Sequence, residues 1–128
     1  MKRILLPAIL AAALLFAGCG GNTVKQSAYQ QITQEEARKM MDEHDVLILD
    51  VREQDEYDSG HIPEAVLLPV GTISEDTAAA AIPEKDSTVL VYCRSGNRSK
   101  KAAAALAELG YTGIYEFGGI TTWPYEVE

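Results

Sequence analysis

Apolar runs alternate with polar and helix-forming segments over most of the chain. Continuous apolar stretches typical of strands buried on both faces occur at residues 46–49, 65–68 and 89–92. A last strand is predicted at residues 114–117. Helix signals separate these stretches, and they lie at residues 33–43, 53–57, 74–82 and 99–109. Strands and helices that alternate in this way predict a parallel α/β sheet with right-handed crossovers. In such sheets ligands bind beyond the carboxyl ends of the strands.

The N-terminal segment has a different pattern. Lys2 and Arg3 precede 14 residues without a charge, at positions 4–17. A basic start, a short apolar stretch and small residues at its end are typical of a secretory signal. At ~1.5 Å per residue the stretch makes a helix of about 21 Å, which is shorter than the ~30 Å hydrocarbon core of a bilayer. We therefore expect a cleaved signal and not a permanent transmembrane helix.

The end of this segment, Leu-Phe-Ala-Gly-Cys at 15–19, resembles the lipobox of bacterial lipoproteins. The resemblance implies cleavage before Cys19, acylation of its thiol, and an extracytoplasmic protein that its lipid anchors to a bacterial membrane. Phe16 departs from the leucine that is usual at its position, and a secreted protein with an unmodified Cys19 is the alternative. The expected organisation is a signal peptide at 1–18, a lipidated cysteine and tether at 19–28, and one domain at 29–128.

The composition excludes several classes of function. Removal of the signal leaves nine basic and 19 acidic residues, and this formal charge of −10 disfavours nucleic acid, whose phosphates dominate binding affinity. The chain has two cysteines, and acylation of Cys19 leaves Cys93 without a partner for a disulfide. Since the only histidines are His44 and His61, a zinc site built on two cysteines is also excluded.

Cys93 ends the third apolar run, and its surroundings favour a reactive thiol. Five polar or glycine residues follow it, and a helix is predicted to begin near Ser99. Successive N–H groups of such a loop, together with the start of a helix, form a cradle for an anion. Gly96 can adopt the left-handed backbone conformation that such a loop requires. The guanidinium of Arg98 can donate two parallel hydrogen bonds to an oxyanion. In these surroundings the pKa of the thiol is lowered. A buried core cysteine is the alternative, but it does not require polar neighbours.

Several motifs in this order resemble a single-domain rhodanese over residues 29–126. They are Asp-Val-Arg-Glu at 50–53, Glu-Tyr at 56–57, Gly-His-Ile-Pro at 60–63, Cys-Arg-Ser-Gly-Asn-Arg-Ser at 93–99, Gly-Gly at 118–119, and Trp123. The resemblance implies an α/β fold with a central five-stranded parallel sheet flanked by helices. It also implies transfer of a sulfane sulfur from a small donor such as thiosulfate to a thiol or cyanide, without a metal or an organic cofactor.

The same resemblance assigns roles to the residues of the site. Cys93 carries the sulfur as a persulfide. The loop that follows holds the donor's oxyanion and the persulfide, and its residues are Arg94, Ser95, Gly96, Asn97, Arg98 and Ser99. Asp50 and Arg52 support the site by tying a strand end to neighbouring loops, and Asp50 also braces the catalytic loop. His61 belongs to a turn and is not expected to act as a general base.

Two further residues of the resemblance lie outside the loop. Trp123 is expected to pack the C-terminal segment onto the core. Glu64 occupies the position of the glycine that is usual after Gly-His-Ile-Pro, so it bears on the geometry of that turn and not on the chemistry.

Two other functions fit part of the pattern, and the first is that of a phosphatase or an arsenate-handling enzyme. Dual-specificity phosphatases of the cell cycle share the fold, but their loop has five residues between the cysteine and the arginine, whereas four separate Cys93 from Arg98. The shorter loop is associated with sulfur chemistry, so the spacing favours sulfur transfer. A non-enzymatic module that holds a persulfide or an oxyanion for a partner protein is the second alternative.

Overall fold

The central sheet of this computed structural model has five strands, all paired in parallel. They are β1 (Gln30–Gln31), β2 (Leu47–Asp50), β3 (Val66–Leu67), β4 (Thr88–Cys93) and β5 (Gly113–Gly119). Their order across the sheet is β1-β5-β4-β2-β3, which confirms the expected five-stranded parallel α/β fold. The structure describes residues 28–128, so the predicted signal peptide, Cys19 and nearly all of the tether lie outside the described residues.

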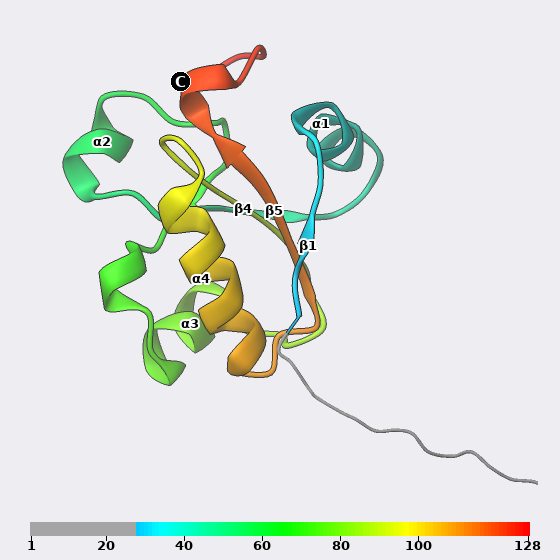
Figure 1. Cartoon of the computed structure of the whole chain (residues 1–128), viewed down its shortest axis with the longest axis vertical. Coiled ribbons are helices and arrows are strands. Elements are labelled where there is room, and N and C mark those ends of the chain that lie inside the picture. Colours follow the sequence, from blue (N-terminus) through cyan, green and yellow to red (C-terminus); the bar gives the residue numbers. More distant parts are fainter. Residues whose placement is uncertain (1–27) are drawn as a thin grey trace, which may run out of the picture.

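Helices cover both faces of the sheet, with α1 on one side and α3 and α4 on the other (Figure 1). The helices are α1 (Gln34–Glu43), α2 (Gln54–Asp58), α3 (Glu75–Ala81) and α4 (Asn97–Glu108), with single turns η2 (Val70–Thr72) and η3 (Ile120–Thr122). Among residues 28–128, no helix combines the length and the apolarity that a membrane crossing requires.

The helix starts follow the capping signals of the sequence with one exception. Thr33 and Glu36 form the predicted capping box of α1, in which the Glu36 N–H donates to Thr33 Oγ1 at 3.0 Å. Ser74 caps α3 in the same way. Helix α4 begins at Asn97, two residues before the predicted Ser99, because Gly96 with φ 108° takes the N-cap position. The loop after Cys93 is therefore shorter than the sequence indicated.

Strand β1 was missed by the apolar pattern. It consists of two exposed glutamines, and it pairs with β5 through Gln30–Tyr115 and Gln31–Glu116. An edge strand of this length needs only backbone hydrogen bonds, which leave no mark on the hydrophobic pattern. The sequence pattern thus predicted four strands, and the fifth was expected only from the family resemblance.

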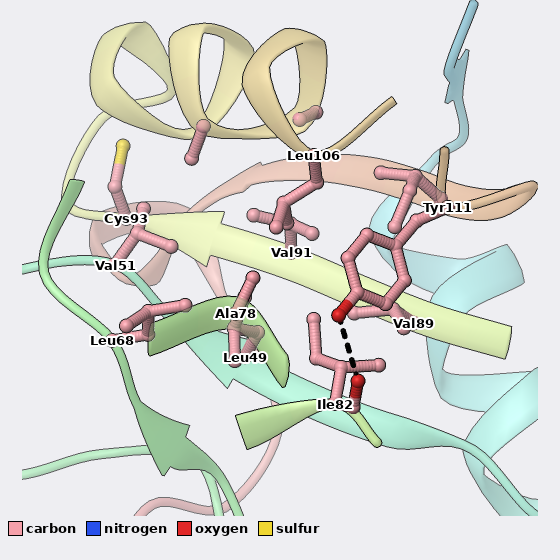
Figure 2. Close-up of a cluster of buried hydrophobic side chains, with 13 residues drawn as sticks. Leu49, Val51, Leu68, Ala78, Ile82, Val89, Val91, Cys93, Leu106 and Tyr111 are labelled. Carbon is pink, nitrogen blue, oxygen red and sulfur yellow. Dashed lines mark hydrogen bonds between the residues drawn. The ribbon is translucent and has the colours of Figure 1, made fainter. Parts of the chain in front are cut away.

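The alternation along β4 decides which face of the sheet carries the thiol. Val89, Val91 and Cys93 point to the face covered by α4, where they pack with a buried cluster that includes Leu106. Leu90 and Tyr92 point to the opposite face and belong to a second cluster. Figure 2 shows Cys93 at the end of the row that begins with Val89, with its sulfur on the side of the helix. The period of two in a strand therefore places the thiol beside the start of α4.

Trp123 packs the C-terminal segment onto the core, as the sequence predicted. Its indole is 8% exposed and lies 5.5 Å from the ring of Phe117 and 4.9 Å from that of Tyr125 (centroid distances). Its Nε1 donates to the carbonyl oxygen of Glu126 at 3.2 Å. The segment after β5 is thus held by aromatic contacts on the face opposite α4.

Candidate active site

The sulfur of Cys93 lies in a loop of backbone N–H groups at the carboxyl end of β4. The side chain is only 1% exposed, and the N–H of Gly96 donates to Sγ at 3.0 Å. Gly96 has φ 108°, a left-handed conformation that residues with a Cβ rarely adopt. This glycine turns the chain so sharply that its own N–H points back at the sulfur three residues earlier.

The hydrogen bonds around Cys93 favour its thiolate. Burial raises the pKa of the thiol. The hydroxyl of Ser99 and the N–H groups of Ser99, Gly96 and Ser95 act in the opposite direction, and together they hold the pKa below the ordinary value of 9.0. Because the thiolate is the nucleophilic form of cysteine, the site is built for attack by sulfur. The structure thus brings together four residues that the sequence predicted at one site.

Gly119, the second glycine of the Gly-Gly pair, packs against the backbone of this loop. A Cβ atom on Gly119 would lie 2.0 Å from the carbonyl oxygen of Arg94, inside any van der Waals contact. Next to it, Thr121 donates to the same oxygen through its N–H at 3.2 Å and its hydroxyl at 3.0 Å. The end of β5 therefore fits directly against the loop that follows Cys93, and only glycine leaves enough room for the contact.

The guanidinium of Arg98 is paired with a carboxylate outside the loop in this structure. Nη1 and Nη2 donate to the two carboxylate oxygens of Glu56 at 2.7 and 2.9 Å. The hydrogen bond from Arg98 is the main cause that lowers the pKa of Glu56 to about 2. The sequence predicted the bidentate geometry but not the partner, since Glu56 entered only as part of a family motif. Binding of an oxyanion by Arg98 stays a prediction, and it would compete with this ion pair.

The remaining loop side chains are exposed. Arg94, Ser95 and Asn97 all lie on the surface, and Arg94 forms no ion pair with any residue of the described range 28–128. Arg94 is thus the loop arginine that keeps an uncompensated charge.

Asp50 and Arg52 form a buried brace beside the site. Arg52 donates to the Asp50 carboxylate through Nη2 at 2.7 Å and through Nε at 2.9 Å. Arg52 Nη2 also donates to the carbonyl oxygen of Gly60 at 2.8 Å, and the Tyr92 hydroxyl donates to Asp50 at 2.6 Å. The pair therefore joins the end of β2 to the turn at Gly60 and to the residue before Cys93.

His61 is engaged in the turn that contains it. Its ring stacks on Tyr57 with centroids 3.8 Å apart, and Nδ1 lies 3.0 Å from the Tyr57 carbonyl oxygen. The backbone of His61 exchanges two hydrogen bonds with that of Glu128. Three residues later, Glu64 has φ 73°, the left-handed conformation that the usual glycine adopts without strain.

One acidic residue of the site was not singled out from the sequence. Glu116 is 2% exposed, and its Oε2 lies 2.5 Å from the hydroxyl of Ser99, which in turn lies 3.4 Å from Cys93 Sγ. The available signal was a carboxylate between apolar residues of the strand predicted at 114–117, because charged residues are rarely buried without a reason.

A hollow of about 290 Å³ adjoins the loop. Its lining includes Gln31, Gln34, Ser95, Gly96, Lys100 and Glu116. Within residues 28–128, no group of three or more histidine, cysteine, aspartate or glutamate side chains is arranged to hold a metal ion.

Comparison with known proteins places this architecture in a family. Residues 33–125 match the family model described as Rhodanese-like domain. A relative from Coxiella burnetii, thiosulfate sulfurtransferase GlpE, is 38% identical over 96 residues, which cover 74% of this chain and 87% of that protein. Thiosulfate sulfurtransferase PspE of Escherichia coli is 38% identical over 72 residues, 56% of this chain and 68% of that protein.

A solved structure agrees with these matches. The structure described as rhodanese with anions from E. coli superimposes with a TM-score of 0.61 at 31% identity, over 66% of this chain and 98% of that one. The family match spans nearly the whole described domain, including the loop around Cys93 and the Gly-Gly pair behind it. This chain belongs to the rhodanese-like domain family.

Proposed function

We propose that this protein is a membrane-anchored sulfurtransferase that carries sulfur as a persulfide on Cys93. The observation that carries the proposal is the buried sulfur of Cys93, which accepts a hydrogen bond from the Gly96 N–H at 3.0 Å and has a lowered thiol pKa. The two relatives named as thiosulfate sulfurtransferases support a sulfane sulfur donor of the thiosulfate class.

The reaction has two half-reactions. The Cys93 thiolate attacks the outer sulfur of thiosulfate, a new S–S bond forms, and the S–S bond of the donor breaks as sulfite leaves with the electron pair. A thiophilic acceptor such as cyanide or a thiolate then attacks the outer sulfur of the persulfide and regenerates the thiolate. Covalent catalysis of this kind gives ping-pong kinetics. The loop N–H groups are already directed at the sulfur, so they stabilise its negative charge without having to reorient during the reaction.

The spacing of the loop supports sulfur over phosphate. Four residues separate Cys93 from Arg98, one fewer than in the related phosphatases. In addition, the Arg98 guanidinium is paired with Glu56, so its two nitrogens are engaged with a carboxylate and not directed to a phosphoryl group. Both features favour a small ring of backbone donors around one sulfur atom.

Intact-mass measurement after treatment with thiosulfate tests the chemistry. The wild-type protein should gain about one sulfur atom's mass, and the gain should disappear on treatment with cyanide as thiocyanate forms. Cys93→Ala should show neither change. A persistent mass gain that cyanide does not remove would indicate a carrier without turnover, and no gain in the wild type would overturn the proposal.

The membrane anchor rests on the sequence around Cys19. The uncharged stretch at 4–17 and the lipobox-like Leu-Phe-Ala-Gly-Cys support acylation of Cys19, which would hold the domain at an extracytoplasmic membrane surface. Growth with an alkyne-tagged fatty acid should label the wild-type protein in the membrane fraction. Cys19→Ala should lose the label and leave the membrane, while Cys93→Ala should keep both.

A further inference from the structure

A chain of three side chains leads from the catalytic sulfur into the protein. Ser99 Oγ lies 3.4 Å from Cys93 Sγ, 3.1 Å from the Gly96 carbonyl oxygen, 3.4 Å from the Gly118 carbonyl oxygen and 2.5 Å from Glu116 Oε2. A serine hydroxyl has one proton to donate. The shortest contact assigns that proton to Glu116 when Cys93 is a thiol, and the Cys93 S–H then donates to Ser99 Oγ.

The partners of Glu116 are all neutral. Apart from Ser99, the N–H of Gly118 donates to Oε2 at 2.9 Å, and Gln31 Nε2 donates to Oε1 at 3.3 Å. No lysine or arginine of the described range forms an ion pair with it. The carboxylate can therefore gain a proton without leaving a buried cation unpaired, which would be costly.

Glu116 lies beside the hollow that adjoins the loop. It lines the hollow of about 290 Å³ next to the loop, whereas Cys93 is 1% exposed and is not part of that lining. The hydrogen bond from Cys93 Sγ to Ser99 Oγ gives a proton that leaves the buried thiol a direct path. Glu116, although only 2% exposed, borders this hollow.

We infer that Glu116 is a positioning residue that takes up the thiol proton of Cys93 through the Ser99 hydroxyl. The S–H proton moves to Ser99 Oγ while the Ser99 proton moves to Glu116 Oε2, so the pair passes from thiol and carboxylate to thiolate and carboxylic acid. Net charge is conserved, and Ser99 then donates to the thiolate. The inference deepens the proposed function, on which it rests, by naming the group that activates the nucleophile.

Arg98, which is paired with Glu56, interacts electrostatically with Cys93. Cys93 faces Ser99 from β4, and Lys100 of α4 lines the same hollow as Glu116. The neighbouring β1 and the first residue of α1 contribute Gln31 and Gln34 to that hollow, and neither titrates. In the relay, one proton is shared between Cys93 and Glu116 through the Ser99 hydroxyl.

The pH dependence of Cys93 alkylation by iodoacetamide tests the inference. The wild-type rate should rise in two steps, one for each proton of the coupled pair. Glu116→Gln removes the carboxylate with little change in shape, and Ser99→Ala removes the link, so each should give a single step. Glu108→Gln makes the same change on the exposed surface of α4 and should keep both steps. A single step in the wild type, superimposable on that of Glu116→Gln, would overturn the inference.

A second measurement needs no variant at the buried position. In protein labelled with ¹³C-glutamate, the side-chain carboxyl signal of Glu116 should move at the same pH values as the Cys93 Cβ signal. Alkylation of Cys93 should remove the shared step. A Glu116 signal that is indifferent to the state of Cys93 would contradict the relay even if Glu116→Gln fails to fold.

These tests are separate from the test of sulfur transfer. Alkylation requires neither a sulfur donor nor an acceptor, so the two-step profile is expected even if thiosulfate adds no mass to Cys93. Conversely, a persulfide on the wild-type protein with a one-step profile would retain the proposed function and exclude the role of Glu116.

Discussion

The guanidinium of Arg98 donates hydrogen bonds to both carboxylate oxygens of Glu56, at 2.7 and 2.9 Å, and the two residues are 42 positions apart in the sequence. The pair connects α2 to the first turn of α4, directly after the loop that follows Cys93. It also neutralises one of the two arginines of the loop, so that uncharged N–H groups provide most of the stabilisation of the Cys93 thiolate. The positive charge that an anionic donor meets is therefore smaller than the sequence indicates.

Glu56→Gln should release that charge. We expect the KM for thiosulfate to fall about threefold, because a partly exposed charge contributes under about 1 kcal/mol and ~1.4 kcal/mol corresponds to tenfold. Steady-state kinetics of thiocyanate formation at varied thiosulfate concentration measure this KM. Asp55→Asn, an exposed change in the same helix, should leave KM unaltered. A raised KM in Glu56→Gln would mean that the ion pair chiefly positions the loop.

The same pair should make the domain less stable in acid. The pKa of Glu56 is about 2 in the folded protein, below its ordinary value of 4.5, so its contribution is complete above pH 4.5 and is lost as the pH falls toward 2. The urea midpoint should drop between pH 6 and pH 3 in the wild type and drop less in Glu56→Gln. Equal drops in the two proteins would assign acid sensitivity to other carboxylates.

Gly119→Ala should damage the loop although the backbone of Gly119, with φ −139°, suits any residue. The new Cβ would meet the Arg94 carbonyl oxygen at 2.0 Å, and overpacking of this kind costs about 1–3 kcal/mol. We expect a lower urea midpoint and little persulfide on Cys93 by intact mass. Gly71→Ala, whose Cβ meets nothing within 4 Å, is the matched control and should behave as wild type in both measurements.

Glu64→Gly should stabilise the domain by about 1 kcal/mol, because a residue with a Cβ is strained at φ 73° and glycine is not. For a domain of this size that corresponds to a rise of about 4–8 °C in Tm. Glu64→Ala keeps the Cβ, so it should show no such rise in thermal unfolding. If both variants gain equally, removal of an acidic charge and not relief of backbone strain would be the cause.

Local features of the chain were predictable because they depend on near neighbours. The capping box at Thr33 and Glu36 needs residues three apart, and it forms as predicted. The apolar run before Cys93 and the glycine after it were sufficient to place a thiol at a strand end beside a helix start. The family resemblance then supplied the fifth strand, which the exposed glutamines of β1 could not indicate.

The sequence by itself therefore determined the four α-helices, four of the five strands, the strand-end position of Cys93 and the loop that turns back on it. The tertiary structure decided which side chains meet there. Glu56 reaches Arg98 and Glu116 reaches Ser99 only because the parallel sheet brings the ends of separate strands and helices to one edge. Such pairs lie 42 and 17 residues apart, and no local pattern encodes them, since their contact depends on the packing of the whole sheet.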